Sequence, residues 1–378
     1  MAGVYIHIPF CHGKCDYCDF YSLGAPVEEL MRRYAAALTS EWRMRRRELG
    51  PEKISSVYIG GGTPSALPYP LLGQIVESIA GEGIDVNALD EFTIEANPED
   101  LTEEWVRQVA SLGINRISMG VQSFDDAELA SVRRRHTAQR AKKALSILAE
   151  SGMNYSADLI YGLPSQSLEG WEKNIETLLA FNPPHFSAYL LSYEPGTPLH
   201  GRLQRGEVEE ASEELAESMY AALCRKSAEA GYRHYEISAF ARHGAEAKHN
   251  SSYWNFTPYL GLGCAAHSFS PRGIRSFNPP NILAYLDRVE NGGTAFEVDE
   301  ETETDRLNDY IITSLRTDNG LSFDFLRSRW GEGAYGRLMK NAGPFIESGK
   351  LETTDDGIRI PEKEWLTADA ILRELIFE

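Results

Sequence analysis

From His7 to Phe20 the chain reads His-Ile-Pro-Phe-Cys-His-Gly-Lys-Cys-Asp-Tyr-Cys-Asp-Phe, directly after a β-like run from Val4 to Ile8. This stretch places Cys11, Cys15 and Cys18 at the spacing C-x3-C-x2-C. Soft thiolate ligands select iron–sulfur clusters or zinc over hard cations, and three thiolates so close together can hold three irons of a [4Fe–4S] cube. The fourth iron then has no local cysteine, so it is free to chelate the amino and carboxylate groups of a small ligand.

Two other uses of the cysteines compete with a cluster. A structural zinc site closes with four ligands, so zinc would need His7, His12, or a distant Cys224 or Cys264 to complete the tetrahedron. A disulfide is disfavoured because the five cysteines are an odd number and the sequence shows no secretory signal peptide. The spacing favours the cluster and resembles the signature of the radical S-adenosylmethionine (radical SAM) superfamily.

Composition sets the broad class of protein. The chain has 378 residues, of which 42% are hydrophobic, enough for one large domain and a smaller one. The net charge of −19 disfavours nucleic acid as a partner, because such binding depends on many Lys and Arg contacts to phosphate. The sequence contains no run of 18 apolar residues, so no transmembrane helix is predicted. We therefore expect a cytoplasmic protein, where reduced thiols suit cluster assembly.

Short β-like runs alternate with helix-like stretches through the first half of the chain. Between the first two runs, residues 26–49 carry Leu30, Tyr34, Leu38 and Trp42 at helical spacing, with a proline at the expected start. Six consecutive βα units predict an α/β fold with a parallel sheet, either an open doubly wound sheet or a full or partial barrel. The six predicted strands are Val4–Ile8, Ser56–Gly60, Glu91–Ala96, Asn115–Gly120, Asn154–Tyr161 and His185–Leu191.

Informative residues lie at the carboxyl ends of these strands, where ligands gather in either architecture. The run Gly60-Gly61-Gly62-Thr63-Pro64 follows the second strand, and glycine lets a backbone approach a ligand closely. Glu95 ends the third strand, Gln122 ends the fourth, and Asp158 lies in the fifth. Each could alone form a turn or cap a helix, but their convergence indicates one ligand site.

Together the motifs resemble the oxygen-independent coproporphyrinogen III oxidase branch of the radical SAM superfamily. The resemblance rests on His-Ile-Pro-Phe-Cys-x3-Cys-x2-Cys, Gly-Gly-Gly-Thr-Pro, Ile-Glu-Ala-Asn-Pro, Gly-Val-Gln-Ser-Phe, Arg-x-His at 134–136 and Asp-Leu-Ile-Tyr-Gly-Leu-Pro. It implies a partial, six-stranded (β/α) TIM-like barrel and a [4Fe–4S] cluster on Cys11, Cys15 and Cys18. It also implies an S-adenosylmethionine site lined by Tyr5, Tyr17, Gly61, Gly62, Thr63, Glu95, Gln122, Arg134 and Asp158.

Two departures separate the chain from the oxidase. The oxidase carries a further cysteine where this chain has Phe20, and it has a longer extension where only three residues precede Val4. Both features match the HemW-type haem chaperones, another group within the same branch. The resemblance therefore implies haem and haem-requiring target proteins as partners, together with an electron donor for the cluster, and it is compatible with a homodimer.

A second motif reads His249-Asn-Ser-Ser-Tyr253-Trp254. Haem iron is commonly held by an axial histidine, and nearby aromatic rings could cover the porphyrin face. A packing or hydrogen-bonding role is the alternative. The motif resembles one associated with haem binding in HemW-type proteins, which makes His249 the first choice of axial ligand, with Tyr253 beside it, ahead of His243 and His267.

The predicted organisation is a radical SAM core with its extension over residues 1–290 and a small C-terminal domain over residues 300–378. The latter reads as three helices, a hairpin from Leu351 to Ile360 and a last helix from Thr367, an order that resembles a winged-helix module. Its net acidic balance disfavours DNA reading, so we expect a lid or docking surface. Cys224 and Cys264 are expected to be small buried hydrophobes.

Two functions follow from these motifs. The first is a haem chaperone that carries haem to target proteins, with the cluster and S-adenosylmethionine as regulatory elements. The second is a radical SAM enzyme acting on a porphyrin, similar to the coproporphyrinogen III dehydrogenase, in which a 5′-deoxyadenosyl radical abstracts hydrogen. Phe20 and the motif at 249–254 favour the first, whereas the filled S-adenosylmethionine positions leave an enzymatic role open.

Overall fold

A single mixed sheet organises the molecule. The computed structural model describes residues 1–25, 27–81 and 83–377. Six parallel strands lie side by side in chain order, which confirms the six predicted βα units and the partial barrel. They are β1 (Ala2–Ile8), β4 (Ile54–Gly61), β5 (Glu91–Ala96), β6 (Arg116–Gln122), β7 (Asn154–Tyr161) and β8 (His185–Leu190).

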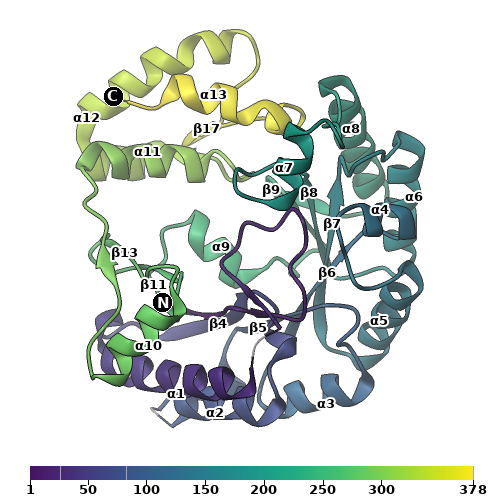
Figure 1. Cartoon of the computed structure of the whole chain (residues 1–378). Helices are drawn as coiled ribbons and strands as arrows, with labels where there is room; N and C mark the ends of the chain where they lie inside the picture. The colour runs from purple at the N-terminus through teal and green to yellow at the C-terminus, as the bar shows by residue number, and fades with distance from the viewer. Residues whose placement is uncertain (26, 82, 378) are drawn as a thin grey trace.

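The helices that connect these strands form an arc around the outside of the sheet (Figure 1). The cap residues follow the sequence: the Thr137 side chain accepts a hydrogen bond from Arg140 N, and Gly152 ends the same helix in the left-handed conformation. The expected helix start at Pro26 lies outside the described residues. The outer helices are α1 (Glu28–Arg45), α2 (Tyr69–Ala80), α3 (Glu103–Ser111), α5 (Ala138–Ser151), α6 (Leu168–Ala180) and α8 (Glu213–Glu229), with the shorter α4 (Asp126–Ser131) and α7 (Pro198–Gln204) beside them.

The sheet extends beyond the predicted strands at both edges. A seventh parallel strand, β11 (Tyr259–Leu262), pairs with β1, and antiparallel strands continue from it and from β8. Sequence reasoning missed β11 because it is only four residues long and contains a glycine. The outer strands are β12 (His267–Phe269), β13 (Arg275–Phe277) and β14 (Glu297–Val298) at one edge, and β10 (Ala239–Ala241) and β9 (Arg233–Glu236) at the other.

The two faces of the parallel strands differ in chemistry. Side chains alternate between faces along a strand, and those that meet the helices, such as Val4, Ile6 and Ile8, are apolar and fully buried. Those on the concave face are polar, and they include Tyr5, His7, Thr93, Glu95, Arg116, Ser118, Ser156, Asp158, His185 and Ser187. A barrel lined in this way is built to enclose a polar ligand, because buried polar groups require partners.

The C-terminal region closes the gap between the two edges of the sheet. It contains α11 (Glu303–Ser314), β15 (Leu321–Ser322), α12 (Phe323–Glu347, kinked at Gly331), β16 (Glu352–Thr353), β17 (Gly357–Arg359), the short 3-10 helix η4 (Glu362–Thr367), and α13 (Ala368–Leu375). At one edge Arg275 of β13 pairs with Asp309, and at the other Arg233 of β9 pairs with Asp318. We call this set of contacts between barrel and C-terminal region the seam.

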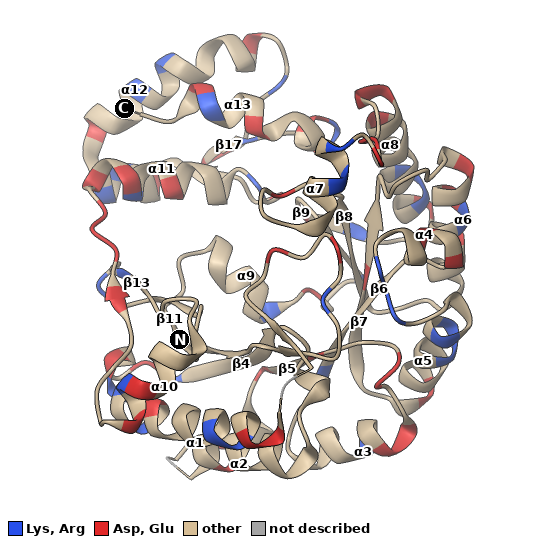
Figure 2. Cartoon of the chain, in the orientation of Figure 1, with Lys and Arg blue, Asp and Glu red and all other residues tan. Residues whose placement is uncertain are grey.

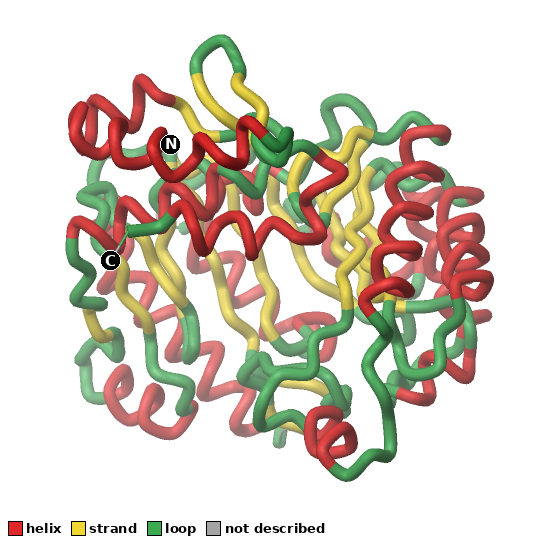
Figure 3. The backbone as a smooth tube through the Cα atoms, turned by 90° about the horizontal axis from the view of Figure 1, so that it is seen from above, coloured by secondary structure: helices red, strands yellow, loops and turns green. Residues whose placement is uncertain are grey.

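Helix α1 carries both acidic and basic side chains, whereas α11 carries three acidic residues and, along its described length, Arg306 as its basic one (Figure 2). The C-terminal region therefore presents no continuous basic stripe along α11 of the kind that would follow a phosphate backbone. Seen from above, the strands run side by side with helices flanking them (Figure 3). In the described part of the chain, no helix is both long enough and apolar enough to cross a bilayer.

Candidate functional site

The three cysteines lie on one loop at the carboxyl end of β1. We call residues 9–24 the cluster loop. It begins and ends in two very short strands that pair with each other, β2 (Phe10–Cys11) and β3 (Leu23–Gly24). Cys11 is buried, Cys15 and Cys18 are partly exposed, and Cys18 N donates a hydrogen bond to Cys15 O at 3.3 Å.

The glycine run at the end of β4 holds this loop in place. Gly62 N donates to Ile8 O at 2.8 Å, and Thr63 N donates to Phe10 O at 2.7 Å. Gly61 has φ +110°, and a Cβ there would lie 2.5 Å from the His7 ring. Glycine is therefore required at this position to pack the barrel's own backbone, in addition to the ligand-facing role that the sequence suggested.

A chain of hydrogen bonds connects two of the cysteine sulfurs. Thr63 Oγ1 donates to Cys11 Sγ at 3.4 Å and accepts from Asn97 Nδ2 at 3.1 Å. Asn97 Oδ1 in turn accepts from Arg134 Nη2 at 2.8 Å, and Arg134 Nη1 lies 3.4 Å from Cys15 Sγ. Donors thus point at both sulfurs, as they do around the sulfurs of iron–sulfur clusters, where such bonds tune the reduction potential.

Sequence reasoning missed Asn97 as a site residue, although it stands in the quoted Ile-Glu-Ala-Asn-Pro motif. Only the fold shows that Asn97 connects Thr63 to Arg134. The signal that could have found it is its place directly after Glu95 and Ala96 at a strand end, where polar side chains meet those of neighbouring strands.

The cysteine environment fits a cluster better than a single ion. Burial raises the pKa of Cys11 and raises that of Cys18 to about 11, so thiolates there need a strong positive charge such as cluster iron. A single ion needs ligand atoms that lie close together. Among the described residues, one group of three His, Cys, Asp or Glu side chains has its ligand atoms within 4.8 Å of one another, and this group does not include the three cysteines. His7, an alternative fourth zinc ligand, has both ring nitrogens in hydrogen bonds. The donor set therefore fits three irons rather than zinc.

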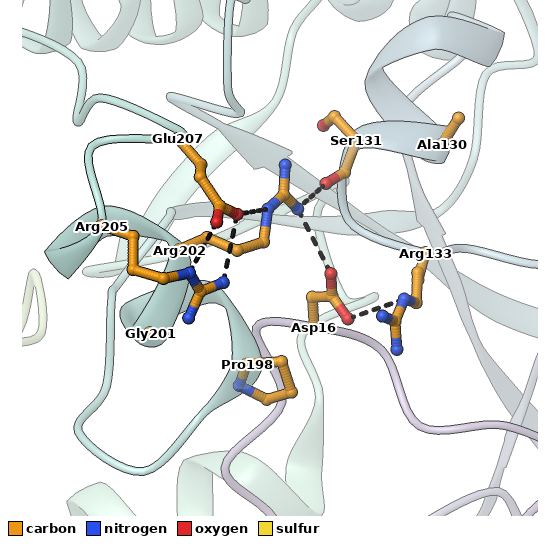
Figure 4. Close-up of a pocket in the computed structure, with 9 residues that line it drawn as sticks. All are labelled: Asp16, Ala130, Ser131, Arg133, Pro198, Gly201, Arg202, Arg205 and Glu207. Carbon is orange, nitrogen blue, oxygen red and sulfur yellow. Dashed lines mark hydrogen bonds and ion pairs between the residues drawn. The ribbon is translucent and has the colours of Figure 1, made fainter.

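Ion pairs of the buried Asp16 carboxylate fix the middle of the cluster loop. Asp16, between two of the cysteines, lies 3.2 Å from Arg202 and 3.3 Å from Arg133, and Arg202 also donates to Ser131 O (Figure 4). These residues line a cavity of about 590 Å³ between the loop, α4 and α7. Arg202 is in turn close to Glu207, so the cations of this cavity are largely neutralised by the protein itself. We assign the arrangement to positioning of the loop.

Glu95 faces the barrel interior next to the glycine run. Its two carboxylate oxygens accept hydrogen bonds from Tyr58 OH at 2.8 Å and from Gly61 N at 3.0 Å. Burial raises the pKa of Glu95 to about 7. A carboxylate in this environment gains from a nearby cation, so it is suited to a positively charged ligand.

Asp158 and Gln122 lie on the next strands of the same face. Asp158 accepts from Ser118 Oγ at 3.3 Å, and burial raises its pKa to about 6. Gln122 has a positive φ of 66° at a register shift between β6 and β7. The irregular backbone re-aims the Gln122 side chain, a feature that bulges often provide next to ligand sites. A Cβ on Gly120 would meet Gln122 Nε2 at 2.8 Å.

Two tyrosines complete the predicted set. Tyr5 OH forms a hydrogen bond with His7 Nδ1 at 3.0 Å, and the ring stacks on Tyr58 in the barrel interior. Tyr17 lies on the cluster loop, where burial raises its pKa and nearby Arg134 opposes that shift. The structure thus places Tyr17 on the cluster loop, Arg134 on the segment after α4 that reaches this loop, and the other predicted S-adenosylmethionine residues at the strand ends or on the concave face.

His249 lies next to Gly3 and Ser56, at the amino-terminal end of the parallel strands, which we call the barrel floor. It belongs to α9 (Lys248–Trp254) and is fully buried, with Nδ1 at 2.9 Å from Ser56 Oγ and Nε2 at 2.9 Å from Tyr253 OH. Glu91 accepts a hydrogen bond from Lys248 N and so holds the start of this helix. Both imidazole nitrogens of His249 are engaged, so a metal could bind Nε2 only after the Tyr253 hydroxyl moves away.

The other histidine candidates for haem differ from His249 in exposure. His243 and His267 are both exposed, and the His267 ring stacks on Phe277. Burial lowers the pKa of His249 to about 3, with buried Arg116 adding to the effect. Its imidazole is therefore neutral at physiological pH, the form in which histidine binds metals.

Comparisons with known proteins agree with this geometry. Residues 5–178 match the Radical SAM superfamily. The chain is 30% identical to "Heme chaperone HemW" of Bacillus subtilis, over the whole length of both proteins. It is 33% identical to the protein of that name in Lactococcus lactis, covering 95% of this chain and 94% of the relative. A solved structure of Escherichia coli coproporphyrinogen III oxidase (HemN) covers 99% of this chain and 90% of its own, with a TM-score of 0.84 at 22% identity, a likeness of fold.

Proposed function

The chain belongs to the radical SAM superfamily and, within it, to the HemW family, and from that premise we propose that it binds haem and delivers it to proteins that require haem. The observation that supports this proposal most is the similarity to "Heme chaperone HemW" over the full length of both chains. Phe20, which stands where the oxidase has a further cysteine, also favours it.

We propose that Cys11, Cys15 and Cys18 hold a [4Fe–4S] cluster whose fourth iron takes S-adenosylmethionine. When bound, the cluster supplies one electron to the sulfonium group. Thr63 and Arg134 donate hydrogen bonds to two of the cysteine sulfurs and so help to orient them. The ion pairs of Asp16 keep the loop over the barrel mouth.

The residues proposed to bind S-adenosylmethionine suit its charges. The cofactor carries a sulfonium and an ammonium group, and Glu95 and Asp158 offer buried carboxylates on the concave face. Tyr5, Tyr17, Gly61, Gly62, Gln122 and Arg134 complete the proposed lining. Because the two carboxylates already accept hydrogen bonds from the barrel, they need little reorganisation to accept a ligand.

We propose His249 as the axial haem ligand and Tyr253 as the residue that controls it. In the present arrangement the Tyr253 hydroxyl occupies Nε2, the position that iron would take. Loss of this hydrogen bond would free the nitrogen. Because both residues lie on α9, haem binding would require the Tyr253 side chain to rotate away from His249.

Haem titrations of four proteins test this assignment. His249→Ala should lose the spectrum of histidine-ligated haem, whereas Tyr253→Phe should bind haem at least as tightly as the unmodified chain. His243→Ala, which removes an exposed histidine, is the matched control and should behave as the unmodified chain. An unchanged spectrum in His249→Ala would remove this residue from the haem site.

A second function, radical SAM chemistry on a porphyrin, is favoured by one observation. Every position proposed for S-adenosylmethionine is filled by a side chain of the expected type. Product analysis with coproporphyrinogen III, a reductant and S-adenosylmethionine separates the two functions. Formation of protoporphyrinogen would overturn the chaperone proposal, whereas unchanged coproporphyrinogen supports it.

Further partners follow from the proposed cofactors. A cluster that passes one electron at a time requires an electron donor, and we propose a protein donor that approaches the cluster loop. We also propose that the protein works in the cytosol, where thiols stay reduced, and that it forms a homodimer. Sedimentation of the cluster-loaded protein, with and without S-adenosylmethionine, tests the dimer.

A further inference from the structure

Three metal-binding side chains meet at the seam, far from the cluster loop. Cys224 comes from α8, His234 from β9 and Glu362 from η4 of the C-terminal region. Their ligand atoms all lie within 4.8 Å of one another. His234 Nδ1 is 2.9 Å from Glu362 Oε1 and 3.9 Å from Cys224 Sγ. We call these three residues the seam triad.

The hydrogen bonds of His234 orient it as a ligand. Its Nε2 lies 3.3 Å from the carbonyl oxygen of Ile237, and a carbonyl can only accept, so we assign the proton to Nε2. Nδ1 faces the carboxylate of Glu362 and the sulfur of Cys224, and its lone pair is available to a metal once Nδ1 carries no proton. A second ring nitrogen that donates to a backbone carbonyl is the usual companion of a histidine bound to metal.

Three electron-rich atoms that face one point need a positive charge between them. A nitrogen, a sulfur and a carboxylate oxygen form the donor set of zinc, a borderline-soft ion. Tetrahedral zinc would separate sulfur from nitrogen by about 3.6 Å and nitrogen from oxygen by about 3.3 Å. The observed 3.9 Å and 2.9 Å differ from these values by a few tenths of an ångström, within the reach of small side-chain rotations.

The surroundings leave room for an ion but not for a flat cofactor. The His234 ring stacks on Phe240 at 4.0 Å and meets the edge of Trp365 at 4.5 Å, so a porphyrin cannot lie over it. The His234 side chain is 3% exposed, whereas that of Glu362 is 50% exposed. Glu362 thus offers an entry path from solvent, and water can fill the fourth position.

We propose that Cys224, His234 and Glu362 bind a zinc ion that ties the C-terminal region to the barrel. Binding would release the thiol proton of Cys224 to solvent and convert the weak contacts of the seam into metal–ligand bonds. Tyr220 already links the same elements, because its hydroxyl donates to Glu362 O at 2.9 Å. This site is separate from the cluster and does not depend on the proposed haem function.

Cobalt titration of the full chain, with its iron–sulfur cluster in place, tests the site. Co²⁺ is a spectroscopic substitute for zinc, and a thiolate ligand gives it an intense charge-transfer band. We expect one Co²⁺ per chain with that band, displaced by Zn²⁺, and a thermal midpoint that rises with Zn²⁺ concentration. Glu362→Gln should weaken binding by about tenfold or more, and Cys224→Ser should remove the charge-transfer band.

Glu364→Gln is the matched control, because Glu364 lies on the same short helix η4 and is not a member of the triad. It should bind Co²⁺ as tightly as the unmodified chain. Equal binding by Glu362→Gln and Glu364→Gln, or a Co²⁺ complex without a thiolate band, would overturn the proposal. His234 and Glu362 would then form only an imidazolium–carboxylate ion pair.

Discussion

The cluster loop and the seam triad both gather metal-binding side chains, but they are assembled in opposite ways. Cys11, Cys15 and Cys18 come from one loop, whereas Cys224, His234 and Glu362 come from a helix, an edge strand and the C-terminal region. The first set is visible as a spacing in the sequence. The second exists only because the C-terminal region closes the gap between the sheet edges, so it also reports whether that closure is in place.

The two sites also differ in what surrounds the sulfur atoms. Around the cluster loop, Thr63 and Arg134 point hydrogen-bond donors at sulfur. At the seam, a carboxylate and an imidazole nitrogen lie close to the Cys224 sulfur, with the Tyr220 hydroxyl as a further neighbour. Donors around sulfur stabilise thiolates that already have metal, whereas several acceptors around one point attract a cation. The environment therefore separates a cluster site from a single-ion site.

The largest effect is expected when each site is broken in turn. Cys15→Ala should abolish the iron content and visible absorption of the cluster, because the cluster loop offers three thiolates and each is needed to hold one iron. The same variant should keep Co²⁺ binding at the seam. Cys224→Ser should keep the cluster and lose the thiolate-ligated Co²⁺ complex at the seam. Iron and cobalt analysis of both variants measures this, and a cluster of normal iron content in Cys15→Ala would contradict the assignment.

The next largest effect concerns the packing of the cluster loop. Gly61→Ala should lower the free energy of unfolding by about 3 kcal/mol, because the new Cβ meets the His7 ring at 2.5 Å and the residue has a positive φ. Urea unfolding of the metal-free chain measures it. Gly24→Ala, in the same loop with no atom within 4 Å, is the control and should change stability by less than about 1 kcal/mol. Equal changes in the two variants would contradict the docking role of the glycine run.

A pH titration should act on the barrel interior through Glu95. Burial raises the pKa of Glu95 from 4.5 to about 7, so the folded chain holds this proton more tightly than the unfolded chain. Stability from this group is therefore greatest at low pH and falls as pH rises from 4.5 towards 7. Affinity for the cationic S-adenosylmethionine should rise with pH up to about 7, by at most about tenfold per pH unit, because Glu95 becomes charged.

Glu95→Gln should flatten this pH dependence in the cluster-loaded protein. Equilibrium binding of S-adenosylmethionine at several pH values measures it, and the unmodified chain, titrated over the same pH range, is the control. A pH dependence that persists in Glu95→Gln would show that another group controls cofactor affinity.

The smallest effect is expected at the exposed part of the seam. Arg233 and Asp318 form an ion pair at 2.6 Å, but the Arg233 side chain is 52% exposed. Arg233→Ala should therefore lower the free energy of unfolding by no more than about 1 kcal/mol, as surface ion pairs do. Urea unfolding with and without Zn²⁺ measures it. A loss several times larger would mean that surface ion pairs, and not the seam triad, hold the C-terminal region to the barrel.

Much of the core could be predicted from the sequence. The six parallel strands lie close to the predicted positions because short β-like runs alternate with helix-like stretches, one of which is capped by Thr137 and Gly152. The cysteine spacing, the glycine run and Glu95 could be assigned because the carboxyl ends of parallel strands meet at one edge of a sheet. These are local patterns, and local patterns can be read without coordinates.

Other features could not be predicted, for a physical reason. The strand β11 and the hydrogen-bond chain through Asn97 depend on contacts between segments that are distant in sequence. The sequence suggested His249 as a haem ligand, but only the fold reveals that Tyr253 and Ser56 occupy both of its nitrogens.

The order of residues in this chain was thus sufficient to determine the parallel strands and the sulfur donors on the loop after the first of them, since spacing and periodicity act over a few residues. Tertiary structure alone decided which polar groups face those sulfurs, how the barrel floor is filled, and that a cysteine, a histidine and a glutamate converge at the seam. Such convergence depends on how distant elements pack, and packing is a property of the whole fold.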